Sequence, residues 1–289
     1  MSSRTLARLQ LIAAAVLFST GGAAIKAAGF TGWQIASFRS GVAAVAIFLM
    51  TPAARRGWTP RAVLVGAVYA TCLTLFVLAN RLTTAANTIF LQSTAPLYLL
   101  ILAPWLLKEP VRRQDLGFML AVAFGLTLFF LGVEQPAATA PDPVRGNLLA
   151  LISGFCWALT VVGLRWLSAK EGRGSPIAAV TSGNLTAFLV TLPFALPLGA
   201  HSIADWSVLV YLGVFQIALA YVLVTSAINH IPALEASVIL LIEPALNPVW
   251  AWLVQGEVPG IWAMAGGAII LAATTAKSWT ERRVEAPVT

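Results

Sequence analysis

The stretch that decides the fold reads ANTIFLQSTAPLYLLILAPWLLKEP at residues 86–110, an apolar run of membrane-spanning length interrupted by prolines. A related stretch, LEASVILLIEPALNPVWAWLVQGEVP, follows at residues 234–259. A shift of 148 positions places Pro96 on Pro244, Glu109 on Glu257 and Ala85 on Ala233. A soluble core has no need of such an element twice, whereas many membrane proteins are built from two related halves. The repeat therefore predicts two such halves.

The composition predicts an integral membrane protein. Apolar residues make up 59% of the 289 residues and charged residues only 10%, whereas charged residues are roughly 25% of a soluble domain. A helix needs about 20 apolar residues to cross the hydrocarbon layer, and its backbone polar groups must be satisfied internally. Ten runs approach or exceed this length: 9–25, 33–51, 62–80, 84–106, 116–133, 147–166, 177–198, 207–227, 234–254 and 259–276.

The positions of Lys and Arg predict that both termini are cytoplasmic. With the N-terminus inside, fourteen basic residues lie in or beside inner loops, and only Lys26, Arg81 and Arg145 lie on the outer side. Such an excess marks the cytoplasmic face. Because each half has an odd number of helices, the second half is expected to be inverted relative to the first. The first apolar run has a counterpart in the second half, so we expect a retained helix and not a signal peptide.

We therefore predict an all-α integral membrane protein with ten transmembrane helices, arranged as two inverted five-helix repeats around a central cavity. The repeats are assigned to residues 1–133 and 147–289, joined by a periplasmic linker at 134–146. The expected location is a bacterial inner membrane, which the chain crosses many times. The net charge of +7 is explained by basic residues in the loops, so we expect no nucleic acid as a partner. The expected partners are lipid and a small-molecule substrate. We expect a monomer.

Glu243 is the most deeply placed carboxylate. It lies about ten residues from either end of its run, or roughly 15 Å deep. A lone carboxylate at this depth usually faces a cavity or a partner, and Pro244 and Pro248 free backbone carbonyls nearby. The alternative is a structural kink with Glu243 bonded to Ser or Thr groups. If Glu243 titrates during transport, replacement by Gln changes the rate or its pH dependence.

Two basic residues are candidate anion or coupling contacts. Arg39 is the only basic residue well inside a predicted helix, and it is suited to bind a substrate carboxylate in a bidentate manner. Its alternatives are snorkelling and pairing with a helix end. Lys26 lies near the end of the first run, where the alternative is an anchor at the membrane interface. Glu109 and Glu257 are expected to make capping or loop contacts.

Polar and aromatic residues of several predicted helices are candidates to line a substrate cavity, with ordinary packing and the interfacial belt as the alternative. They are Thr20, Tyr69, Thr74, Gln92, Tyr98, Trp157, Gln216, Tyr221, Glu243 and Asn247. The sequence has no phosphate-loop motif and no H-E-x-x-H, so we expect no ATP-driven pump, no metal, no cofactor and no enzyme. Cys72 and Cys156 are expected to be small core residues.

The residues around both prolines resemble those of the EamA family of the drug/metabolite transporter superfamily. The similar segments are Pro96 with Lys108-Glu109-Pro110, Glu243-Pro244 with Gly256-Glu257-Val258-Pro259, SFRSGVAAVAIFL at 37–49 and FSTGGAAIK at 18–26. The resemblance spans about residues 9 to 276, and within the family the chain looks most like YddG-type amino-acid exporters. It implies a central cavity between helices 1, 3, 4, 6, 8 and 9, and alternating access. Related small multidrug antiporters carry a carboxylate where this chain has Phe18, so proton antiport by that device is not expected.

These observations together predict a secondary transporter that exports small metabolites, including aromatic and other amino acids, without ATP. Three alternatives remain open: a carrier for drug-like cations, a carrier for phosphorylated or nucleotide-linked sugars, and a lipid scramblase. A sugar-phosphate site would require several cations in one place, and only Arg39, Lys26 and Arg165 are available.

Overall fold

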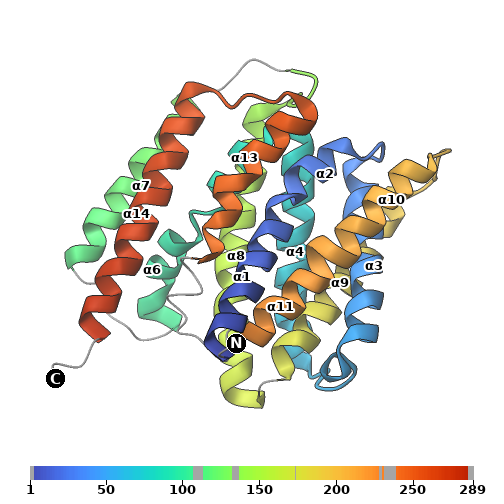
Figure 1. Cartoon of the computed structure of the whole chain (residues 1–289), viewed down its shortest axis with the longest axis horizontal. Coiled ribbons are helices and arrows are strands. Elements are labelled where there is room, and N and C mark those ends of the chain that lie inside the picture. Colours follow the sequence, from blue (N-terminus) through green and yellow to red (C-terminus); the bar gives the residue numbers. More distant parts are fainter. Residues whose placement is uncertain are drawn as a thin grey trace.

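The computed structural model describes residues 3–106, 113–131, 137–172, 174–227, 230 and 239–285. Every regular element in these ranges is a helix, and the only β pairing within them is an isolated bridge between Ala137 and Ala140. Figure 1 shows the helices packed side by side as a bundle. The prediction of an all-α protein is confirmed.

The helices follow the predicted apolar runs. The N-terminal part contains α1 (Ser3–Ser19), α2 (Gly21–Ala27), α3 (Gly32–Met50), the 3₁₀ turn η1 (Pro52–Arg55), α4 (Pro60–Leu82), α5 (Ala85–Gln92), α6 (Ala95–Leu106) and α7 (Arg113–Leu131). The C-terminal part contains α8 (Pro143–Glu171), α9 (Ser175–Ala195), α10 (Ile203–Tyr211), the π-helical segment η2 (Leu212–Leu219), α11 (Ala220–Ala227), α13 (Ile242–Gln255) and α14 (Ile261–Glu285).

Six helical spans among the described residues are long and apolar enough to cross a membrane. They are Ser3–Ala27, Gly32–Met50, Pro60–Leu82, Pro143–Glu171, Ser175–Ala195 and Ile203–Ala227, and two shorter apolar helices cover Leu116–Leu131 and Ile261–Ala276. The chain is therefore a multi-pass membrane protein. The predicted run at 84–106 corresponds to α5 and α6 together, and part of the run at 234–254 lies outside the described residues.

Helix breaks occur at equivalent positions of the sequence repeat. Ser93 ends α5 shortly before Pro96, and Leu241 precedes α13 shortly before Pro244. The shift of 148 positions that aligns the prolines also places Ser93 on Leu241. A proline ring excludes the carbonyl four residues earlier from the helix ladder, so both breaks follow from the same local chemistry.

α8 is one of several helices that begin earlier than their apolar runs. α8 starts at Pro143, inside the segment assigned to the linker, because the side chain of Asp142 accepts a hydrogen bond from the Arg145 amide at 3.1 Å. A proline in the first turn of a helix costs nothing, since its missing donor would be unpaired there. A search for runs of apolar residues does not detect polar capping residues, so the sequence analysis placed the start of this helix too late.

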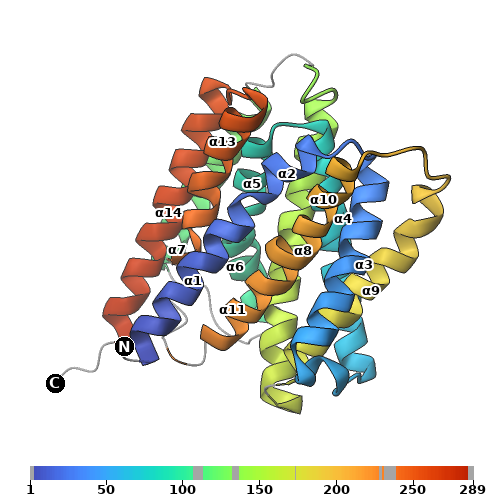
Figure 2. The same ribbon diagram turned by 45° about the vertical axis from the view of Figure 1, so that its right-hand side comes forward.

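The bundle interior is formed by α1, α4, α8 and α11 with the helices that flank them. α4 packs against α8 and α9, α3 packs against α9 and η2, and α1 packs against α11 and α13. Figures 1 and 2 both show α7 and α14 side by side at one flank. Small residues recur four positions apart on both helices, at Ala121 and Gly125 and at Ala263 and Gly267, a spacing that lets helices pack closely in lipid.

The α7–α14 contact depends on glycine. On α14, a Cβ atom at Gly267 would lie 2.5 Å from the ring of Phe90 on α5, whereas one at Gly266 would lie 2.6 Å from the carbonyl oxygen of Gly125 on α7. No side chain fits between these backbones. The two helices are thereby held at the flank, outside the helices that carry polar residues.

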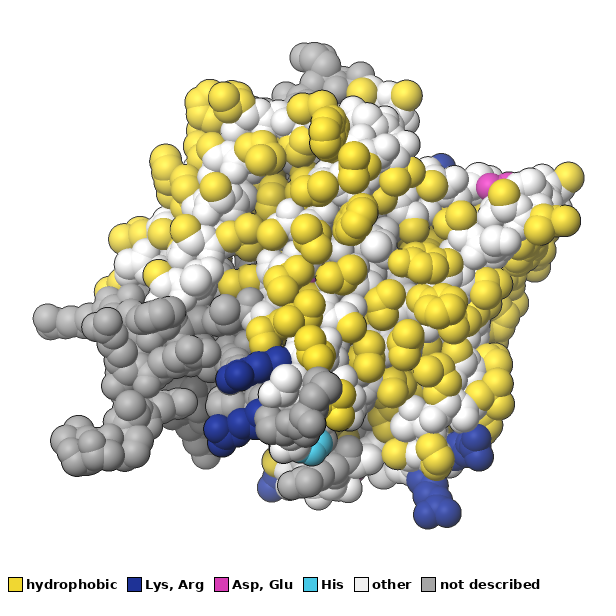
Figure 3. Space-filling model, viewed as in Figure 1, with side chains coloured by type: hydrophobic (Ala, Val, Ile, Leu, Met, Phe, Trp, Pro, Cys, Tyr) yellow, Lys and Arg dark blue, Asp and Glu magenta, His cyan; other side chains and the backbone are white. Residues whose placement is uncertain are grey.

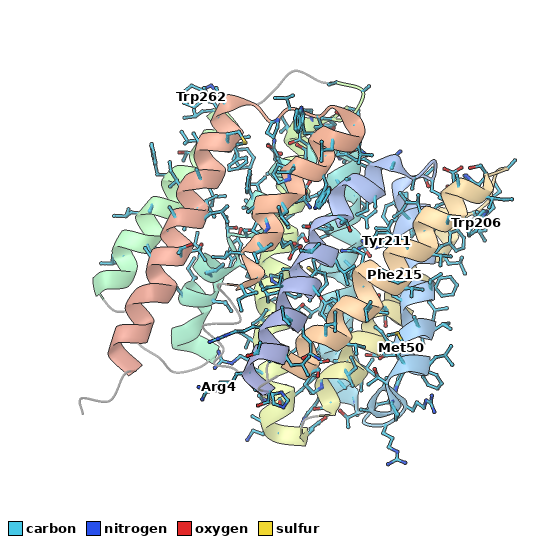
Figure 4. The ribbon with its side chains drawn as sticks, in the orientation of Figure 1. Arg4, Met50, Trp206, Tyr211, Phe215 and Trp262 are labelled. Carbon is cyan, nitrogen blue, oxygen red and sulfur yellow. The ribbon has the colours of Figure 1, made fainter. Side chains whose placement is uncertain are left out.

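The two ends of the bundle differ in surface chemistry. Figure 3 shows a broad apolar surface, with Lys and Arg gathered toward the end where α1 begins. Figure 4 places Arg4 at that end, and Trp206 and Trp262 toward the opposite end. An apolar band between a basic end and an end carrying tryptophan is typical of membrane proteins.

Replacing Gly266 with Leu is expected to lower the thermal midpoint of the detergent-solubilised protein by several degrees. The added side chain must displace the α7 backbone, and overpacking of this kind costs roughly 1–3 kcal/mol. Gly117, on the partner helix α7, is the control, because a Cβ there meets no atom within 4 Å. Equal melting of the two leucine variants would show that the glycine contact does not hold α14.

Candidate functional site

A pair of glycines on α2 admits two amide side chains from the C-terminal part. A Cβ at Gly21 would lie 2.8 Å from Nε2 of Gln216, and one at Gly22 would lie 2.8 Å from Oδ1 of Asn247. Larger residues at these positions would push both amides away. Gly21 and Gly22 therefore allow η2 and α13 to approach α2 closely.

Several polar atoms of these amides are buried without partners. Asn247 is 0% exposed, and neither Oδ1 nor Nδ2 has a hydrogen-bond partner among the described residues. Oε1 of the buried Gln216 is also without one. Leaving a buried polar atom unpaired costs about 1–3 kcal/mol, so such groups are uncommon outside strained or functional places.

An aromatic cluster lies beside these amides. Tyr221 on α11 makes edge-to-face contacts with Phe18 on α1 at 5.3 Å and with Tyr69 on α4 at 5.5 Å, measured between ring centroids. Trp157 on α8 packs against the same core cluster. Glu243, which is half-buried in the first turn of α13, is close enough to Tyr221 to interact electrostatically.

Arg39 lies fully inside the bundle. Its side chain is 1% exposed, and Nη2 donates one long hydrogen bond, 3.4 Å, to the carbonyl oxygen of Leu73. Nε and Nη1 have no partner among the described residues. Tyr69, Tyr221 and Cys72 are its electrostatic neighbours. Arg39 therefore does not snorkel toward the membrane surface.

The π-helical segment η2 and the preceding α10 pack against α3. A Cβ at Gly213 would lie 2.6 Å from the Val42 side chain and 2.8 Å from the carbonyl oxygen of Arg39. π-helical turns are rare and are frequent at functional sites. The apolar periodicity contains no signal for this wide turn, and sequence reasoning missed it.

Thr20 and Ser19 bond to aromatic residues of the C-terminal part. Oγ1 of Thr20 lies 2.9 Å from the Tyr211 hydroxyl, and Nε1 of Trp250 donates to Oγ of Ser19 at 2.9 Å. Tyr211 was not among the predicted residues, because it stands at the end of an apolar run without a polar neighbour. These bonds fix the bend between α1 and α2.

Three other predicted residues bond to neighbouring backbone or side chains. Nε2 of Gln92 donates to Oγ of Ser153 at 2.8 Å, and the Tyr98 hydroxyl donates to the Leu151 carbonyl at 3.3 Å. Oγ1 of Thr74 donates within its own helix to Ala70, at 2.9 Å. Their assignment to a substrate cavity stays a prediction.

Lys26 forms a buried ion pair with Glu257. Nζ lies 3.1 Å from Oε1, and the two side chains are 4% and 3% exposed. Nζ also donates to the carbonyl oxygens of Thr83 and Thr139, while Oε2 of Glu257 accepts from the Ala85 amide at 2.8 Å. Lys26 is thus not an exposed anchor, and Glu257 makes the expected capping contact with α5. Glu109 lies outside the described residues.

The ligand types that hold metals do not cluster here. Among the described residues, no group of three or more His, Cys, Asp or Glu side chains is arranged to bind an ion. Ser202 and Asp205, which stand together in the sequence with His201, form a capping box at the start of α10. In the part of the chain that the structure describes, the arrangement offers binding groups in an apolar interior.

Replacing Asn247 with Leu is expected to raise the thermal midpoint by a few degrees, because it removes two buried polar atoms that lack partners. Asn147 is the matched control, since it is equally buried but its Oδ1 accepts from Thr83 at 2.8 Å and from Asn87 at 3.2 Å. The same change at Asn147 should lower the midpoint. Destabilisation of comparable size at both positions would show that Asn247 is satisfied in the folded protein.

Comparison with known proteins gives matches along most of the chain. Residues 5–131 and 144–277 match the sequence profile of the EamA-like transporter family. The pseudopaline exporter CntI of Pseudomonas aeruginosa is 26% identical over 285 residues, which cover 95% of this chain and 96% of that protein. The threonine/homoserine exporter RhtA of Escherichia coli is 29% identical over 164 residues, or 55% of this chain and 54% of that protein.

One solved structure is similar over nearly the full length. It covers 98% of this chain and 100% of its own chain, with a TM-score of 0.65 and 17% sequence identity. At this identity the likeness concerns the fold alone.

Proposed function

Because the chain belongs to the EamA-like transporter family, and is thus a transporter and not an enzyme, we propose that it exports amino acids or metabolites carrying an amino-acid group. The relatives named above are exporters of pseudopaline and of threonine and homoserine. Export of a small metabolite is the activity they share, and the amino-acid group is our more specific assignment.

One observation carries this assignment: a carboxylate and unpaired amides lie beside aromatic rings in an otherwise apolar bundle. Glu243 and Asn247 belong to the same helix, and Tyr221 lies within electrostatic reach of Glu243. Ionisable groups at membrane depth usually mark the path of a substrate or ion. We assign Glu243 to the substrate ammonium, and Tyr221, Phe18 and Trp157 to its apolar side chain.

The proposed architecture is ten transmembrane helices in two inverted repeats, residues 1–133 and 147–289, joined by a linker at 134–146. The two family matches and the equivalent breaks before Pro96 and Pro244 support it. The basic end of the bundle supports cytoplasmic termini, and bacterial relatives support the inner membrane. The repeats rock about the site between them, so that each side of the membrane gains access in turn.

The test is uptake into liposomes that contain only the purified protein. Labelled threonine and phenylalanine are offered without an ion gradient, with vesicles lacking protein as the control. Saturable uptake that reaches equilibrium is expected. Transport of cationic drugs, sugar phosphates or lipid headgroups with no uptake of any amino acid would overturn the proposal.

Replacing Glu243 with Gln is expected to raise the apparent KM for amino acids by about 10- to 100-fold, the equivalent of one charge-assisted hydrogen bond. Glu171 is the matched control. It lies at the basic end of the bundle, where Oε2 accepts from Thr59 at 2.6 Å, and its replacement by Gln should leave KM unchanged. An unchanged KM in the Glu243 variant would limit this residue to a structural role.

A further inference from the structure

Arg39 carries a charge that no acidic residue neutralises in the described part of the chain. The ion pairs found there are Lys26–Glu257 and Arg61–Glu171. The effective penalty for burying an ion is several kcal/mol unless it is paired, and a guanidinium offers five N–H donors with no acceptor. A single 3.4 Å bond to the Leu73 carbonyl leaves most of that capacity unused.

Tyr69 on α4 is an electrostatic neighbour of Arg39, and its hydroxyl interacts with the side chains of Tyr221 on α11 and Asn184 on α9. The Tyr69 hydroxyl and Oδ1 of Asn184 are buried, and neither makes a hydrogen bond of good geometry among the described residues. The guanidinium fork and the phenolic hydroxyl are the donors that a planar carboxylate accepts.

The available charge favours a carboxylate over a phosphate. Lys26 is committed to Glu257, and Nη1 of Arg81 is directed at the carbonyl oxygens of Ile25, Lys26 and Ala28 at 3.4–3.5 Å. No second uncommitted cation accompanies Arg39 within the described ranges. One cation balances a monoanion, whereas a phosphate dianion requires more.

We propose that Arg39, assisted by the Tyr69 hydroxyl, is the subsite for the substrate carboxylate. The proposal rests on the export function above and narrows its substrates to carboxylate-bearing ones. Tyr221 lies within electrostatic reach of both Arg39 and Glu243, so the cation and the carboxylate that a zwitterion requires are both near this ring. Opening of the Tyr69–Tyr221 contact between α4 and α11 gives the substrate access to Arg39.

The test compares phenylalanine with phenethylamine, which has the same ring and ammonium but no carboxylate. In liposomes the wild-type protein is expected to prefer phenylalanine by at least about 10-fold in kcat/KM, the equivalent of one charge-assisted hydrogen bond. Arg39→Met should abolish the preference while phenethylamine transport continues. Arg145→Gln, at an exposed position in the first turn of α8, is the matched control and should keep it.

A second variant covers the case in which Arg39→Met fails to fold. Tyr69→Phe keeps the ring contact with Tyr221 and should raise the KM for phenylalanine about 3- to 10-fold, with phenethylamine unaffected. An undiminished preference for phenylalanine in either folded variant would overturn the carboxylate subsite but leave amino-acid export standing. Absence of amino-acid uptake by the wild type would instead overturn the export proposal itself.

Discussion

The buried guanidinium of Arg39 is the constraint around which the interior is arranged. A charge placed among apolar helices is tolerated only where neighbouring dipoles or a counter-ion stabilise it. Here the neighbours are the Leu73 carbonyl and two tyrosines, and no carboxylate of the described chain reaches it. Two of the helices around Arg39, α4 and α11, also carry the aromatic residues Tyr69 and Tyr221. The unused hydrogen-bond donors of Arg39 therefore lie beside the aromatic rings.

Buried polar groups of the bundle differ in how far they are satisfied. Toward the end of α2, Lys26 and Glu257 are paired and also bonded to backbone, although Oε1 of the nearby Gln255 lacks a partner. At the start of α2, Gln216 and Asn247 approach through two glycines and carry polar atoms without partners. Natural proteins depart from full polar satisfaction mainly at functional sites, so these two amides are candidates to contact a ligand.

Sequence reasoning reached the helices but only part of the site. Length and apolarity define the spans, and the chemistry of proline places the breaks before Pro96 and Pro244. Spacing along a helix gives the depth of a residue, not the direction in which it points. Gln92 and Tyr98 were therefore grouped with Tyr221, although their polar atoms bond to α8. Nor does sequence separation predict that Lys26 pairs with Glu257 across the bundle, or that η2 widens beside α3.

The most direct test is a structure of the protein with an amino acid bound. We expect the substrate carboxylate to lie within hydrogen-bonding distance of Nε or Nη1 of Arg39, with the ammonium toward Glu243 and the side chain against Tyr221. A carboxylate bound at Lys26 or at a helix N-terminus, with Arg39 still unpaired, would contradict it.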